Sequence, residues 1–135
     1  MRTAAGDRGS VTIEVVLFAP VFALLLAFVV LAGRVQAARA DVEGAARSAA
    51  RSITLSRDLN AGTTQAEADA RDSLNVGSST CREFAMTTER TPDQVTVRLS
   101  CVVDLASAGA LPVPATMTVT GEATEVIDQY RESAS

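Results

Sequence analysis

The feature that most constrains this chain is a run of eighteen residues, Val15 to Ala32, that is apolar and carries no charge. An α-helix rises about 1.5 Å per residue, so the run would be roughly 27 Å long, close to the hydrocarbon thickness of a bilayer at about 30 Å. No other part of the sequence has a comparable run. The sequence therefore predicts a transmembrane helix over residues 10–32, and the membrane is the first expected partner.

The composition of the remainder limits what the protein can do. The 135-residue chain has a net charge of −4, no histidine and two cysteines. A negative chain is poorly suited to nucleic acid, so we expect no nucleic-acid partner. Without histidine, Ser-His-Asp and Cys-His catalysis are excluded, and no phosphate-binding or dinucleotide-binding loop is present. We therefore expect no enzyme, no cofactor and no metal site.

The residues around the start of the apolar run form a motif. Residues 1–9 are a short polar leader with Arg2 and Arg8, and GSVTIE follows at Gly9 to Glu14. This arrangement resembles the class III leader of type IV pilins and pseudopilins, in which a prepilin peptidase cuts after the glycine. The resemblance implies that Gly9 precedes the cut, that Ser10 becomes the new N-terminus, and that Glu14 is the glutamate at the fifth mature position.

The wider segment resembles a narrower family, the TadE-like minor pilins of the tight-adherence (Tad/Flp) pilus system. The matching residues are GSVTIEVVLFAPVF, with Pro20 six residues after the glutamate, and AARSAAR at Ala45 to Arg51. Val15 stands where Flp pilins often carry tyrosine, which favours a minor component. The resemblance implies a subunit of a Tad/Flp-type pilus or a related secretion machine. Its partners would be the prepilin peptidase, other pilin subunits through the N-terminal helix, and the assembly machinery.

Two residues of the motif have both a general and a specific interpretation. Glu14 is either an interfacial carboxylate reaching to water or the partner of the α-amine that cleavage would create at Ser10 of a neighbouring subunit. Pro20 removes one helical hydrogen bond and predicts a kink. That kink is either an ordinary feature of a membrane helix or a point where the helix partly unwinds on leaving the bilayer.

The orientation of the anchor has conflicting signals. Arg34, Arg39, Arg47 and Arg51 follow the apolar run, and a count of basic residues would place that flank in the cytoplasm. The two cysteines and the leader resemblance favour an exported C-terminus. We expect a single-pass protein of the cell membrane with its C-terminus outside, an orientation compatible with incorporation into a surface pilus.

The helix is expected to continue over residues 33–56. Small and apolar residues recur there every three or four positions, at Val35, Ala38, Val42, Ala45 or Ala46, Ala49 and Ile53. Because most of this stripe is alanine, another helix could approach it closely. Two interpretations stay open, in which the stripe packs on the protein's own head or on sister helices.

Residues 57–135 are expected to form a small α+β head outside the cytoplasm. We predict a break over 57–62, a capping box at Thr64 and Glu67 with a short helix over 66–74, and a β-hairpin of 81–88 and 94–103. A third strand is expected over 115–124, after a linker at 106–114. Cys81 and Cys101 would lie at the open end of the hairpin, where a disulfide is geometrically possible and a pair of free thiols is the alternative. A zinc half-site is disfavoured, because the sequence has no histidine and no further cysteine.

Two other functions are compatible with the sequence. The chain could be a signal-anchored envelope protein with a binding head, in which GSVTIE is accidental. It could also be a small secreted disulfide domain, because Ala38-Arg39-Ala40 fits a small-x-small cleavage site and release after Ala40 would leave Asp41 as the new start.

Overall fold

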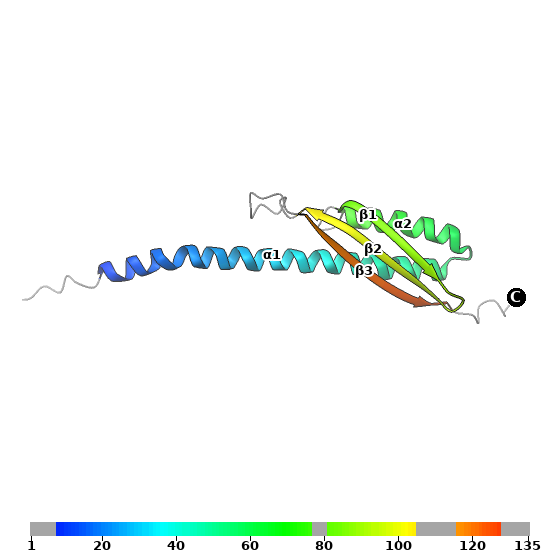
Figure 1. Ribbon diagram of the computed structural model, residues 1–135, viewed down its shortest axis with the longest axis horizontal. Helices are drawn as coiled ribbons and strands as arrows, with labels where there is room; N and C mark the ends of the chain where they lie inside the picture. Colours follow the sequence, from blue (N-terminus) through cyan, green and yellow to red (C-terminus); the bar gives the residue numbers. More distant parts are fainter. Residues whose placement is uncertain (1–7, 77–80, 105–115, 128–135) are drawn as a thin grey trace, which may run out of the picture. The chain divides into compact units, whose positions relative to one another are not determined.

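The computed structural model describes residues 8–76, 81–104 and 116–127, with side chains from residue 13 onward. Two helices, α1 (Arg8–Leu55) and α2 (Leu59–Val76), precede three strands, β1 (Cys81–Arg90), β2 (Gln94–Asp104) and β3 (Thr116–Val126) (Figure 1). The predicted α+β class, with a long N-terminal helix, a short helix and a three-stranded antiparallel sheet, is confirmed. The chain divides into two compact units, Met1–Gly33 and Arg34–Ser135, and α1 contributes to both.

The short helix starts earlier than the sequence predicted. The carboxylate of Asp58 accepts hydrogen bonds from the backbone N–H groups of Asn60 and Ala61 at 2.9 and 3.4 Å, so Asp58 is the N-cap of α2. Thr64, the predicted cap, lies inside the helix and donates its hydroxyl to the carbonyl of Asn60 at 3.2 Å. The capping box at Thr64 was therefore wrong. The predicted break over 57–62 exists but is shorter, because α1 ends at Leu55 and α2 begins at Leu59.

Gly62 explains this difference. The glycine was taken as a sign of a break, yet it is buried inside α2 and faces the end of α1. A Cβ at this position would come within 2.6 Å of the Ser56 Cβ atom. Gly62 is thus present because the two helices approach closely at their connection, and the helix tolerates its lower propensity.

The hairpin and the third strand agree closely with the prediction. β1 pairs antiparallel with β2, and β2 pairs antiparallel with β3, giving the order β1-β2-β3. The β1–β2 register is interrupted by a bulge between Cys81 and Glu83, whereas the β2–β3 register is regular from Gln94 opposite Val126 to Asp104 opposite Thr116. The predicted linker at 106–114 lies outside the described residues.

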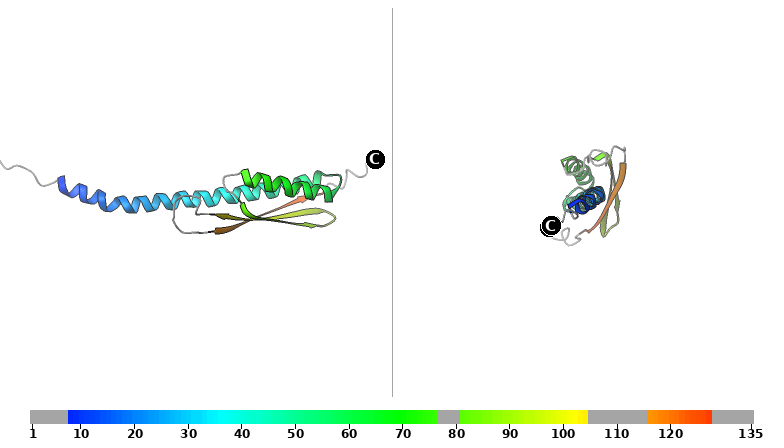
Figure 2. Two further views of the ribbon diagram at one scale, coloured as in Figure 1. Left: turned by 90° about the horizontal axis from the view of Figure 1, so that it is seen from above. Right: turned by 90° about the vertical axis from the view of Figure 1, so that its left-hand side faces the viewer.

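The core of the second unit lies between one face of the sheet and the two helices. Figure 2 shows the sheet as one layer and α2 with the adjoining part of α1 as the other. β2 is buried at every second residue, as its alternating sequence requires, and α2 is buried at every fourth. The core side chains are Ala38, Val42, Ala45, Ala46, Ala49, Ala50, Ile53, Ala66, Ala70, Leu74, Val95, Val97, Leu99, Cys101, Val103, Val119 and Ala123.

The alanine stripe of α1 belongs to this core. Val42, Ala46 and Ile53 are each no more than 1% exposed, and they cluster with the inward residues of the sheet and of α2. Of the two interpretations that the sequence left open, packing of the stripe on the protein's own head therefore holds for Ala38 to Ile53.

Candidate assembly site on the N-terminal helix

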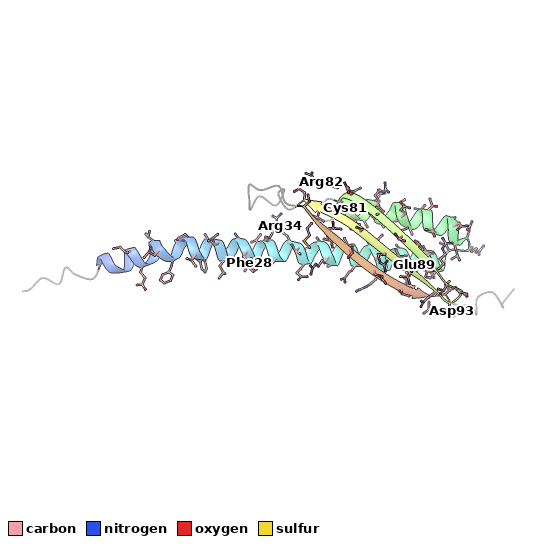
Figure 3. All side chains as sticks on the ribbon, in the orientation of Figure 1. Phe28, Arg34, Cys81, Arg82, Glu89 and Asp93 are labelled. Atoms are coloured by element: carbon pink, nitrogen blue, oxygen red, sulfur yellow. A yellow bond between two sulfur atoms is a disulfide. The ribbon has the colours of Figure 1, made fainter. Side chains whose placement is uncertain are left out.

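The first unit presents an apolar helical surface. From Ile13 to Val30 its large apolar side chains are between 49 and 73% exposed, and many of them are drawn in Figure 3, where Phe28 is labelled. By length and composition, one helix among the described residues could cross a membrane, with the candidate span given as Ile13–Leu55. Exposed side chains of this size are costly in water, so this surface suits a surrounding of lipid or of other helices.

Glu14 lies on this apolar surface. It is exposed, and one helical face carries it together with Val15, Phe18, Ala19 and Phe22, which form a shallow apolar hollow. Phe18 and Phe22 follow Glu14 at intervals of four residues, so the carboxylate and the two rings lie along the same side of α1. Among the described residues no hydrogen bond or ion pair reaches Glu14. A carboxylate in this position can accept a cation supplied from outside the unit.

The other predicted residues of this segment also lie in α1. Gly9 and Ser10 lie in the first turn of α1, where the backbone alone is described. Pro20 lies inside α1, so its nitrogen donates no hydrogen bond to the preceding turn. Cleavage between Gly9 and Ser10 and a kink at Pro20 remain predictions.

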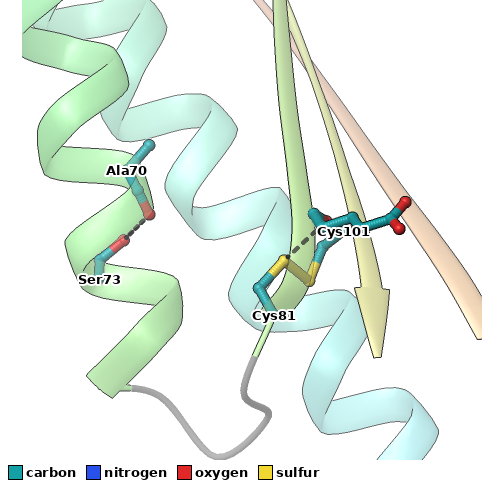
Figure 4. The surroundings of a disulfide bond; sticks show 5 residues. Ala70, Ser73, Cys81 and Cys101 are labelled. Carbon is teal, nitrogen blue, oxygen red and sulfur yellow. Dashed lines mark hydrogen bonds between the residues drawn. A yellow bond between two sulfur atoms is a disulfide. The ribbon is translucent and has the colours of Figure 1, made fainter. Parts of the chain in front are cut away.

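The two cysteines form a disulfide in the second unit. The Cys81 and Cys101 sulfur atoms are 2.05 Å apart, and the bridge joins the first residue of β1 to β2 (Figure 4). Cys101 is directly opposite Phe84 in the ladder, and the bulge between Cys81 and Glu83 lets the Cys81 side chain reach it. The two cysteines are 20 positions apart in the sequence, so the disulfide closes a loop of about that length.

β1 also holds α2 in place, through contacts that the sequence analysis missed. The Arg90 guanidinium donates to the Leu59 carbonyl at 3.1 Å and the Asn60 side-chain oxygen at 3.0 Å, and it also contacts Thr63. Near the other end of α2, the guanidinium of Arg71 lies 5.1 Å from the centre of the Phe84 ring. No sequence signal identifies such pairs, because 31 residues separate Arg90 from Leu59.

The outer face of the sheet is polar. Arg98 of β2 donates twice to the Glu122 carboxylate of β3, at 2.7 and 2.9 Å, and this hydrogen-bonded ion pair raises the pKa of Arg98 above its ordinary value. The hydroxyls of Thr96 and Thr124 are 2.9 Å apart on the same face. No group of acidic, histidine or cysteine side chains among the described residues is arranged to hold a metal ion.

One segment of the chain matches a known protein family. Residues 9–51 match the family described as TadE-like protein. The match begins at the predicted cleavage glycine and ends at the last residue of the AARSAAR motif. It therefore includes the candidate site and the whole buried stripe of α1 except Ile53. Searches of curated proteins and of solved structures found no match to this chain.

Proposed function

We propose, on the premise that residues 9–51 form the TadE-like segment of this chain, that the protein is a membrane-anchored minor pilin or pseudopilin of a Tad/Flp-type pilus or a related secretion machine. The observation that carries the proposal is the combination of that match with an exposed apolar helix that has a single carboxylate, Glu14, near its start. The role is structural: the protein is a substrate of a prepilin peptidase and not itself an enzyme.

In this proposal the apolar part of α1 holds the subunit in the bilayer until assembly. Cleavage after Gly9 frees an α-amine at Ser10, and the amine of one subunit pairs with the Glu14 carboxylate of a neighbour. A lone carboxylate in hydrocarbon costs several kcal/mol, so this pairing sets the register between subunits. Pro20 allows the helix to bend as it moves from the bilayer into a helical bundle. The second unit lies outside the cytoplasm, where the disulfide is stable.

Cleavage after Ala40, which would give a secreted domain, fits the structure poorly. Ala38 is 3% exposed and belongs to the core of the second unit, and Asp41, the first residue of such a product, lies inside α1. Release at this point would remove a core residue and shorten the helix that covers the sheet. These observations favour an anchored protein over a released one.

The test is the N-terminal sequence and the unreduced intact mass of the protein purified from native membranes. The proposal expects a start at Ser10, and it expects Gly9→Val to block cleavage while Gly33→Ala, in an open part of α1, leaves it unchanged. A start at Asp41 would identify a secreted domain. An uncut N-terminus in cells that hold an active prepilin peptidase would leave a plain membrane anchor.

The role of Glu14 is tested separately. Glu14→Gln is expected to be cleaved normally but to lose co-purification with other pilin subunits after crosslinking in membranes. Glu43→Gln is the matched control, because Glu43 is an exposed carboxylate of the same helix outside the apolar part. Equal crosslinking of the two variants would contradict the assigned pairing.

A further inference from the structure

Two arginines of α1 have no partner on the protein. Several other arginines of the second unit form ion pairs with carboxylates, and these are Arg47, Arg71, Arg82 and Arg98. Arg34 and Arg39 are exposed, and among the described residues no hydrogen bond or ion pair reaches either of them. Figure 3 labels the first of the two. Both guanidinium groups are therefore available to an anion from outside the chain.

These two arginines are the charges that follow the apolar run most closely. Between Glu14 and Asp41 they are the only charged residues, and α1 continues through both positions. At about 1.5 Å per residue, Arg34 and Arg39 lie roughly 3 and 10 Å beyond Ala32 along the helix. Side chains of a helix lean toward its N-terminus, which is the direction of the apolar run. Both side chains therefore extend back toward whatever surrounds that run.

The surroundings of the apolar run determine which anion is near. In the membrane-anchored state that the proposed function requires, and on which this inference rests, the run is surrounded by lipid. The headgroup layer on each side of the hydrocarbon is about 5–8 Å thick, so Arg34 lies within it and Arg39 lies at its outer boundary. A guanidinium donates two parallel N–H groups to a phosphate. We propose that Arg34 and Arg39 bind the phosphates of anionic phospholipid headgroups and so fix the depth of the helix in the membrane.

The charge of the remaining chain restricts this binding to the two arginines. Residues 41–135 hold fourteen acidic residues against eight arginines, so an anionic membrane surface repels them as a whole. Arg51 is also exposed on α1 and has no hydrogen bond or ion pair among the described residues. It lies about 28 Å beyond Ala32, however, and the attraction of an anionic surface falls off within about 8–10 Å. Arg51 is therefore the matched control.

The experiment uses the full chain with isotope-labelled arginine, in bicelles of phosphatidylcholine that are enriched stepwise in phosphatidylglycerol. The arginine Nε–H signals are followed by NMR and assigned with the variants Arg34→Gln, Arg39→Gln and Arg51→Gln. We expect the signals of Arg34 and Arg39 to shift as phosphatidylglycerol is added, and the signal of Arg51 to shift by about a fifth as much or less. Inorganic phosphate added to phosphatidylcholine bicelles should leave all three signals in place.

Lipid retention measures the size of the effect. The protein is released from vesicles of the two lipids, and the lipids that stay bound are counted by native mass spectrometry. One arginine near an anionic surface strengthens the attraction about fivefold, so the double variant Arg34→Gln/Arg39→Gln should retain about tenfold less phosphatidylglycerol, or lower still. Arg51→Gln should retain as much as the wild type. The proposal is overturned by equal retention in the double variant, by an Arg51 signal that shifts as much as the other two, or by the same shifts with inorganic phosphate.

Flotation with vesicles of phosphatidylcholine alone separates this proposal from the proposed function. A protein that floats but shows no preference for phosphatidylglycerol in the other measurements overturns headgroup binding alone. A protein that does not float contradicts the membrane anchor, and with it both proposals. Neither result depends on whether the subunit enters a pilus.

Discussion

Replacing Gly121 by alanine tests the close contact between β3 and the backbone of α1 in the second unit. The new Cβ would lie 2.9 Å from the carbonyl carbon and oxygen of Val42 and from the nitrogen of Glu43. Carbon atoms pack at about 3.5–4.0 Å, so β3 and α1 would have to separate by about 0.6 Å or more. The obstructing atoms are backbone, so no side-chain rotation relieves the contact.

The expected cost follows from two opposing effects. Overpacking of this kind costs about 1–3 kcal/mol, and replacing a strand glycine by alanine returns about 0.5–1 kcal/mol through backbone entropy. We expect Gly121→Ala to lower the free energy of unfolding by about 1–2 kcal/mol. For a domain near 100 residues this lowers the melting temperature by roughly 5–15 °C.

The assay is thermal unfolding of the full chain in micelles by circular dichroism, with hydrogen exchange of the β2 and β3 amides to isolate the second unit. The matched control is Gly44→Ala, since Gly44 has nothing within 4 Å of its virtual Cβ. Better helix propensity should raise stability there by up to about 1 kcal/mol. A Gly121→Ala protein as stable as the wild type would refute the close packing of β3 on α1.

Three further changes test other contacts with the same assay. Gly62→Ala should destabilise the connection of the two helices, because the new Cβ would meet the side chain of Ser56. Adding Ser56→Gly removes that side chain and should restore stability in the double variant. A double variant that is no more stable than Gly62→Ala alone would contradict this contact. Replacing Cys81 and Cys101 together by alanine should cost about 3 kcal/mol, since the bridge encloses about 20 residues; unfolding that a reducing agent does not affect would argue against the bridge. Thr88→Val should raise the free energy of unfolding by about 1 kcal/mol, because the Thr88 hydroxyl is buried and has no hydrogen-bond partner among the described residues. A less stable variant would mean that this hydroxyl has a partner.

Much of the secondary structure could be predicted because its signals are local. The hairpin follows from alternating β-branched residues on both sides of the turn near Pro92, and the strands begin and end within two residues of the predicted limits. The start of α2 could not be predicted from local signals. Gly62 and the Thr64–Glu67 pair suggested a later start, and the outcome depends on contact of Gly62 with Ser56 at the end of α1.

The residues discussed with the candidate site also fall into two groups, those that could be predicted from the sequence and those that could not. Gly9, Ser10, Glu14 and Pro20 were identified from their order along the chain, because a leader motif is a local pattern, and the match over residues 9–51 covers the same stretch. The contacts that Arg90 and Arg71 make could not be found in this way. Each depends on which residues a distant segment brings near.

The sequence by itself determined that the chain has a long apolar helix and a hairpin with two cysteines at its open end. Those features depend on period, length and composition, which are local properties. Only the tertiary structure decided that the alanine stripe of α1 packs on its own sheet and that Gly121 lies against the backbone of α1. A stripe of small residues fits any close neighbour equally well, so the choice of neighbour depends on the packing of the whole unit.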